Sequence, residues 1–100
     1  MDLNALFQQA QKLQEEMRRA QERLAGKTVT GSAGGGLVVV TANGKGEIQK
    51  VQIDPKAVED IAMLEDLVLA AINSALRAAQ EAAKVEMPLQ GMLPPGMGFP

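Results

Sequence analysis

The side chains in this chain that could bind another molecule are basic and gather near its start. Lys12, Arg19 and Arg23 recur at spacings of seven and four residues, which places them on one face of a helix, with Arg18 beside them. Guanidinium and ammonium groups arranged along one face suit the oxygens of successive phosphates. This face is therefore a candidate phosphate-binding surface.

The same stretch also favours a plainer interpretation, in which the charges pair locally and keep the surface solvated. Glu15 with Arg19, and Arg18 with Glu22, stand four residues apart, where each ion pair stabilises a helix by only about 0.2–0.5 kcal/mol. An arginine held in so weak a pair remains available to a phosphate. The two interpretations are compatible, and the residues alone do not separate them.

The charge is distributed unevenly along the chain. The formal net charge is −2, yet residues 18–53 carry six basic and two acidic side chains, a net of +4, and residues 54–86 carry three basic and seven acidic ones, a net of −4. A polyanion responds to local charge, so a basic surface can exist on an acidic protein. The total, with a pI of about 5.0, favours ordinary solvation of charged faces.

Catalysis is disfavoured by composition. The chain has no Cys and no His, which removes thiolate nucleophiles, the common zinc ligands and the usual near-neutral general base. The acidic pairs Glu15-Glu16, Glu59-Asp60 and Glu65-Asp66 suit exposed helix faces, and the glycine-rich stretch 31–36 precedes a strand without the Gly-Lys-Ser/Thr ending of a phosphate loop. We expect no enzyme activity, cofactor, metal or small-molecule substrate.

The basic face lies on a predicted helix over residues 2–25. Its apolar residues form two interleaved repeats of seven, a narrow stripe that suits packing against one other helix: Leu3, Ala10, Met17 and Leu24, with Leu6, Leu13 and Ala20. Asp2 or Asn4 can cap its start, and Gly26 can end it in the left-handed conformation. At 1.5 Å per residue this rod is roughly 35 Å long, more than a chain of this size needs for a globule.

The middle of the chain changes to the pattern of strands. Residues 27–33, 37–42 and 47–53 are rich in β-branched side chains, and short connections make them an antiparallel meander. Asn43-Gly44 is a strong hairpin signal because both residue types tolerate positive φ.

A second helix is predicted over residues 61–86, and it is apolar around most of its circumference. The first helix is expected to cover one side of it, the sheet another side near its start, and a partner chain the rest. Residues 1–86 then form one domain, and the Pro- and Gly-rich residues 87–100 a poorly ordered tail. No apolar run approaches the roughly 18–20 residues that span a bilayer and no signal peptide is visible, so we expect a soluble, intracellular protein without membrane contact.

Several stretches taken together resemble the YbaB/EbfC family of bacterial nucleoid-associated proteins. They cover most of the chain: Val29-Thr30-Gly31-Ser32-Ala33-Gly34-Gly35-Gly36-Leu37-Val38, Asn43-Gly44, Ile53-Asp54-Pro55, Met63-Leu64-Glu65-Asp66-Leu67-Val68, Ala71-Ile72-Asn73-Ser74-Ala75 and Pro94-Pro95-Gly96-Met97. The resemblance implies an α+β fold of order α-β-β-β-α, a three-stranded antiparallel sheet with two long flanking helices. It also implies a tweezer-like homodimer that binds DNA in the cytoplasm, at the nucleoid. One departure is Val39, where family members often have Lys.

The hypothesis is thus a homodimer that binds double-stranded DNA through its phosphates, with little base readout. No aromatic side chain is placed to stack on a base, which disfavours single strands. The main contacts are expected from Arg18, Arg19, Arg23 and Lys27, with Lys12, Arg77 and Lys84 along the arms. The alternative is a protein-binding helical scaffold or a chaperone-like clamp.

Overall fold

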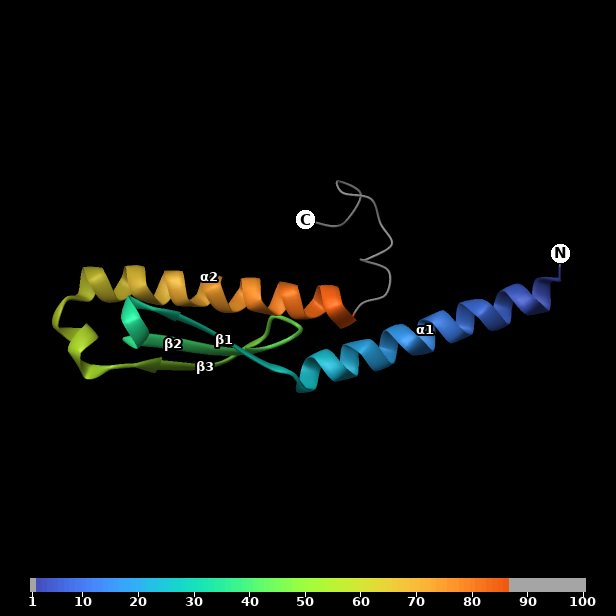
Figure 1. The fold of residues 1–100 in the computed structure, drawn as a ribbon, viewed down its shortest axis with the longest axis horizontal. Helices are drawn as coiled ribbons and strands as arrows, with labels where there is room; N and C mark the ends of the chain where they lie inside the picture. Colours follow the sequence, from blue (N-terminus) through green and yellow to red (C-terminus); the bar gives the residue numbers. More distant parts are fainter. Residues whose placement is uncertain (1, 87–100) are drawn as a thin grey trace.

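The computed structural model describes residues 2–86 and has the predicted order, α-β-β-β-α (Figure 1). Two short 3₁₀ segments, Gly34–Gly36 and Pro55–Glu59, join the main elements. The main elements are α1 (Leu3–Gly26), β1 (Thr28–Ala33), β2 (Val38–Asn43), β3 (Ile48–Ile53) and α2 (Ile61–Glu86). The tail expected at residues 87–100 lies outside the described residues.

The three strands form one antiparallel sheet in the order β1-β2-β3. In its register, Val40 of β2 lies between Gly31 of β1 and Val51 of β3. The helix α2 packs across β1 and β2, and leaves β3 uncovered. One face of the sheet therefore meets a helix over two strands and lacks a cover over the third.

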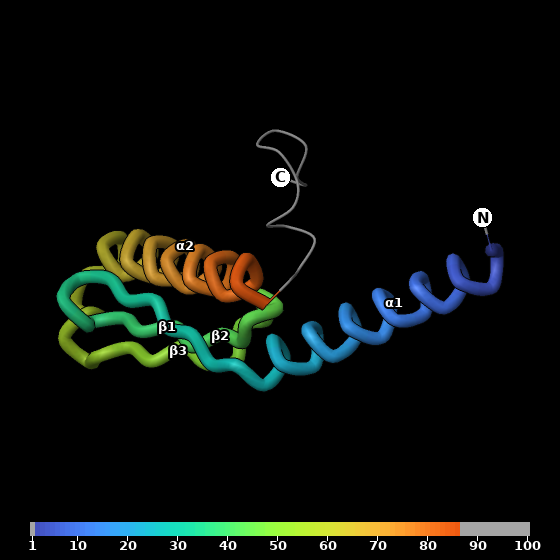
Figure 2. Tube along the Cα trace, turned by 45° about the vertical axis from the view of Figure 1, so that its right-hand side comes forward, coloured from blue at the N-terminus to red at the C-terminus, as the bar shows by residue number. Residues whose placement is uncertain are grey.

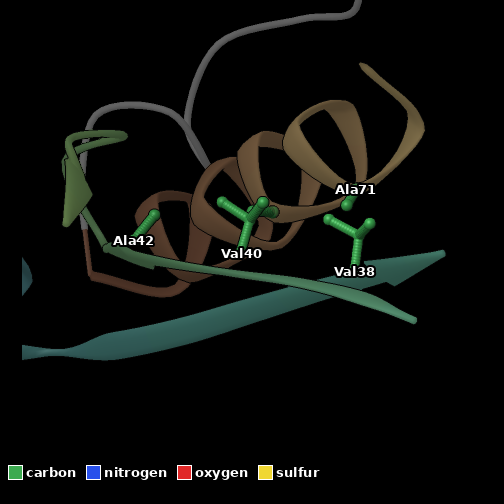
Figure 3. Packing of buried hydrophobic residues seen from close by; sticks show 5 residues of the cluster. Val38, Val40, Ala42 and Ala71 are labelled. Carbon is green, nitrogen blue, oxygen red and sulfur yellow. The ribbon is translucent and has the colours of Figure 1, made fainter. Parts of the chain in front are cut away.

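The core between the sheet and α2 is built from small side chains (Figure 3). Val38, Val40 and Ala42 of β2 are buried against Ala71 and Ala75 of α2. The buried alanines of α2 continue to Ala82. The α2 residues that pack in this cluster run from Leu64 to Ala75, so the sheet covers α2 from near its start, as expected, to its middle.

The first helix does not cover α2, contrary to the sequence-based expectation. Figures 1 and 2 show α1 running away from the sheet and α2, with only its C-terminal end beside them. Its buried residues are Ala20 and Leu24, both in the last two turns. The molecule is 68 Å long and its radius of gyration is 18.5 Å, against about 13 Å for a compact chain of 100 residues. The helix α1 is thus a projecting arm.

The attachment of the arm differs from the predicted glycine cap. The Asp2 side chain accepts a hydrogen bond from the Asn4 amide, as expected for a cap. At the other end Gly26 has no positive φ, and the Leu24 carbonyl accepts hydrogen bonds from the amides of Lys27 (3.1 Å) and Gly44 (2.8 Å). An amide of the β2–β3 hairpin therefore donates to carbonyl groups at the end of α1, and the helix ends there without a left-handed residue.

The hairpin itself forms where Asn43-Gly44 predicted it, but its geometry is different. Positive φ occurs at Gly46, not at Asn43 or Gly44. The buried Asn43 side chain accepts hydrogen bonds from the amides of Lys45 and Glu47. Gly44 is required for another reason, since a Cβ there would lie 2.9 Å from the Leu24 carbonyl oxygen.

Candidate nucleic-acid interface

The arm carries most of the predicted basic residues, and all of them are exposed. Lys12, Arg18, Arg19 and Arg23 lie along α1, and Lys27 follows it directly. None of these side chains is needed for the core, because only Ala20 and Leu24 of α1 are buried. The projection of α1 thus presents their cationic groups to solvent along one rod.

The local ion pairs expected from the spacing are present. Glu15 contacts both Arg18 and Arg19, the latter at 3.4 Å, and Arg18 also bonds Glu22. Hydrogen bonding by Arg18, aided by the charges of both arginines, lowers the pKa of Glu15. Hydrogen bonding to Glu15 raises the pKa of Arg18 in turn. These groups stay charged near neutral pH, and their exposure keeps the arginines within reach of an incoming phosphate.

Another ion pair joins the two helices. Arg23 Nε donates to Glu86 Oε2 at 2.8 Å, where the C-terminal ends of α1 and α2 meet. The hydrogen bond from Arg23 is the main cause of a lowered pKa of Glu86, and the charges of Arg23 and Lys27 add to it. The fold therefore brings Glu86 to the end of α1, where Arg23 and Lys27 act on it.

The β2–β3 hairpin adds a basic residue that sequence reasoning missed. The Gly44 amide also lies 2.9 Å from the Lys27 carbonyl oxygen, so the exposed Lys45 follows a residue docked on Lys27. We call Arg23, Lys27 and Lys45 the basic joint. The positive charge of residues 18–53 included Lys45, but no pattern in the sequence indicated that the hairpin docks on α1.

The remaining predicted residues lie outside this joint. Lys84 is in the last turn of α2 and pairs with Glu81 at 3.2 Å. Arg77 lies seven residues earlier on the same helix, and Lys12 lies eleven residues before Arg23, about 16 Å along the arm. The structure therefore gathers some of the predicted residues closely and spreads the others along two helices.

Within residues 2–86, the face of the sheet opposite α2 is mainly polar and no helix packs on it. Thr30, Thr41 and Lys50 stand side by side across the three strands. Val39 lies on this same face, between Ser32 and Gln52. The resemblance implies a lysine at position 39, and this chain has Val39 there. Lys50 supplies a positive charge on the same face.

Within residues 2–86, Phe7 is the one aromatic side chain. Phe7 is 67% exposed on α1, five residues before Lys12. It lies in the second turn of α1, sixteen residues before Arg23 of the basic joint. A single-stranded competitor is therefore a useful control in binding experiments.

Among the described residues we find neither a group placed to hold a metal ion nor a hollow closed off from solvent among those detected. Within residues 2–86, no group of three acidic side chains is placed to hold a metal ion, and no helix is long and apolar enough to cross a membrane. A hollow on α1, lined by Ala5, Gln8, Gln9, Gln11 and Lys12, is formed by one helix and open to solvent. The exposed basic side chains of α1 and of the basic joint can bind a polyanion.

Known proteins match the chain over most of its length. A family described as the YbaB/EbfC DNA-binding family matches residues 1–91. A nucleoid-associated protein of Rhodococcus erythropolis is 50% identical over 102 residues, covering 99% of this chain and 89% of the relative. One of Xanthomonas campestris is 52% identical over 98 residues, covering 95% and 92%. The crystal structure of an uncharacterized protein from Helicobacter pylori has a TM-score of 0.79 and 29% identity, covering 85% and 91%.

Proposed function

Because the chain belongs to the YbaB/EbfC DNA-binding family, we propose that it binds duplex DNA by placing the arm α1 and the basic joint against the phosphate backbone. The observation that carries this proposal is the projecting helix with its exposed arginines. At the C-terminal end of this helix stand Lys27 and the docked hairpin that carries Lys45. Lysine and arginine side chains along a rod neutralise phosphates without reading bases. Arg18, Arg19, Arg23 and Lys27 supply the main contacts, with Lys12, Arg77 and Lys84 beyond them.

The protein acts as a homodimer in this proposal. On β3, the side chains of Ile48, Val51 and Ile53 lie on the same face as the core residues of β2, yet they are 41–43% exposed because α2 does not reach them. We call these three side chains the apolar strip. The strip lies on β3, an edge strand whose outer side pairs with no other strand within residues 2–86. Such an edge invites pairing. A second copy of the chain would cover the strip and double the number of arms.

The cellular role follows from the relatives and not from the site alone. The similar proteins are named nucleoid-associated, and a dimer with two cationic arms can organise DNA by holding its backbone. We propose that the protein acts in the cytoplasm at the nucleoid, where it also affects gene expression. We propose no enzyme activity for it.

The test is an anisotropy titration against random-sequence duplex DNA at two salt concentrations. Replacing Arg19 and Arg23 by Ala should weaken binding to every duplex sequence alike, since phosphate contacts carry no sequence information. It should also flatten the dependence of affinity on salt, by about one unit of slope for each phosphate that the variant no longer neutralises. Circular dichroism should show unchanged helix content, because neither side chain is buried.

The matched control is Lys50→Ala with Lys56→Ala, which removes the same charge from β3 and from the segment after it. The control should bind nearly as well as the unsubstituted protein. An equal loss of affinity in both double variants would contradict the arm as the main contact. Tighter binding to a single-stranded competitor would instead implicate Phe7.

The alternative of a protein-binding scaffold or clamp is favoured by the apolar stripe along the arm. Leu3, Leu6 and Leu13 of that stripe are exposed, and an exposed apolar row can bind a partner helix. This function predicts negligible DNA affinity at physiological salt and no effect of the Arg19 and Arg23 substitutions. The same titration therefore separates the two functions.

A further inference from the structure

The contact between Arg23 and Glu86 is unusual in where it places a negative charge. Glu86 is the last residue of α2, and a carboxylate at the C-terminal end of a helix is disfavoured by the helix dipole. Arg23 lies in the last turn of α1, where a positive charge is favoured. Within residues 2–86, their hydrogen bond is the one side-chain hydrogen bond that links α1 to another element.

The carboxylate also takes up one of the donors that Arg23 could offer to a phosphate. Glu86 Oε2 lies 2.8 Å from Arg23 Nε, and its side chain is only 22% exposed against 56% for Arg23. Lys27 contributes a second positive charge to the same carboxylate. A guanidinium binds carboxylate and phosphate oxygens by the same N–H donors. Glu86 bonds the Nε donor of Arg23, so a phosphate must displace Glu86 to use that donor.

We propose that Glu86 is an intramolecular competitor of DNA, a carboxylate that occupies the phosphate site formed by Arg23 and Lys27 until the backbone of a bound duplex displaces it. This inference rests on the proposed DNA-binding function and adds a control on its affinity. The arm stays attached during the exchange, because the buried Ala20 and Leu24 and the hydrogen bond from the Gly44 amide do not involve Glu86. The exchange therefore changes affinity and leaves the fold intact.

The competition also explains how the fold moderates a nonspecific interaction. A phosphate that contacts Arg23 Nε must first break the ion pair with Glu86. The contact therefore contributes less binding free energy than the same contact with an unpaired arginine would. Arg18 is held in a similar way by Glu15 and Glu22, but those carboxylates are neighbours on the same helix. Glu86 differs because it is 63 residues away from Arg23 in the sequence and is brought there only by folding.

The experiment measures the affinity of the full chain for random-sequence duplex DNA at two salt concentrations. Glu86→Gln should tighten binding by about two- to fivefold, the range in which exposed ion pairs contribute to an equilibrium. It should also steepen the salt dependence by up to about one unit for each protomer. Glu86→Ala, which removes the acceptor altogether, should give at least the same gain.

The matched control is Glu59→Gln, which removes the same charge from the segment before α2, at the far end of the body. It should leave the affinity close to that of the unsubstituted protein. Adding Arg23→Ala should cost more affinity in the Glu86→Gln background than in the unsubstituted protein, because only the former offers Arg23 unoccupied. A purely structural contact would not produce this difference.

Each other outcome has a distinct meaning. Equal effects of Glu86→Gln and Glu59→Gln would reduce the result to net charge and overturn the competition. Weaker binding by Glu86→Gln with unchanged helix content would make Glu86 a positioning residue for the arm, and would also overturn it. If neither the unsubstituted protein nor Glu86→Gln binds duplex DNA, the proposed function fails, and this inference fails with it.

Discussion

At the scale of single residues, the approach of β1 to α2 depends on Gly31. A Cβ built on Gly31 would lie 2.2 Å from the Ala75 nitrogen and 2.5 Å from the Ala71 oxygen. These are backbone atoms of α2, which cannot rotate away as a side chain can. The alanines of α2 and Gly31 together allow the helix and the strand to pack closely.

We predict that Gly31→Ala lowers the free energy of unfolding by about 3 kcal/mol, at the upper end of the usual cost of overpacking. Urea unfolding followed by circular dichroism measures this change. The control is Gly26→Ala on α1, where a Cβ has no neighbour within 4 Å and φ is not positive. This control should be neutral or stabilising by up to about 1 kcal/mol, since Ala favours a helix over Gly. A destabilisation of the same size in both variants would be inconsistent with the close approach.

At the scale of elements, the arm is held by its last two turns. Leu24 is buried between α1 and the hairpin, and its Cδ2 lies 2.8 Å from the position of a Cβ on Gly44. Leu13 belongs to the same apolar stripe but is 40% exposed. Replacing each leucine removes the same side chain. A comparison of the two therefore distinguishes a leucine that attaches the arm to the body from one that only lies on its apolar stripe.

We therefore expect Leu24→Ala to destabilise the protein by about 2–3 kcal/mol through the cavity that it leaves. Leu13→Ala should change the free energy of unfolding by less than about 0.5 kcal/mol, as exposed positions usually do. Thermal and urea unfolding of the two variants, compared side by side, measure both values. A comparable destabilisation by Leu13→Ala would show that the stripe is covered in the assembled protein, and would support a helical partner for the arm.

At the scale of the whole molecule, the proposed dimer depends on the uncovered face of β3. Apart from Leu24, the buried core of residues 2–86 consists of alanines and valines, with Val38 and Val40 as its largest fully buried side chains. Such a core stabilises a small domain weakly. Burial of the apolar strip by a second copy would add buried apolar area that the fold of residues 2–86 leaves exposed.

The dimer is tested by mass. Light scattering at micromolar concentration should give about twice 10.6 kDa, and Val51→Lys should shift the mass toward that of one chain with the fold retained. Gln52→Lys is the control, because Gln52 is paired with Val39 on the opposite face of the strand. Ile72→Asp should impair folding and dimerisation together, since Ile72 packs against the buried cluster and a charge there lacks a partner. A mass near 10.6 kDa for the unsubstituted protein would exclude a tight dimer.

The elements themselves were predictable from local spacing. The heptad stripe of residues 2–25 and the broad apolar pattern of residues 61–86 gave both helices nearly to the residue, and alternation with a turn at Asn43-Gly44 gave the hairpin. The pairs Glu15–Arg19 and Arg18–Glu22 were also confirmed. These features depend on neighbours within a few residues, which a periodicity or a spacing describes completely.

The arrangement of the elements was decided only by tertiary structure. Periodicity shows that a face of α1 is apolar, but not what covers it, and the arm in fact projects away from α2. The docking of Gly44 on Leu24, the approach of Gly31 to Ala75 and the pairing of Arg23 with Glu86 each join residues far apart in the chain. These contacts depend on the distance between α2 and the sheet, which the small core side chains set. No pattern within a few residues predicts that distance. For this reason the sequence determined which residues carry charge, and the fold determined which of those charges meet.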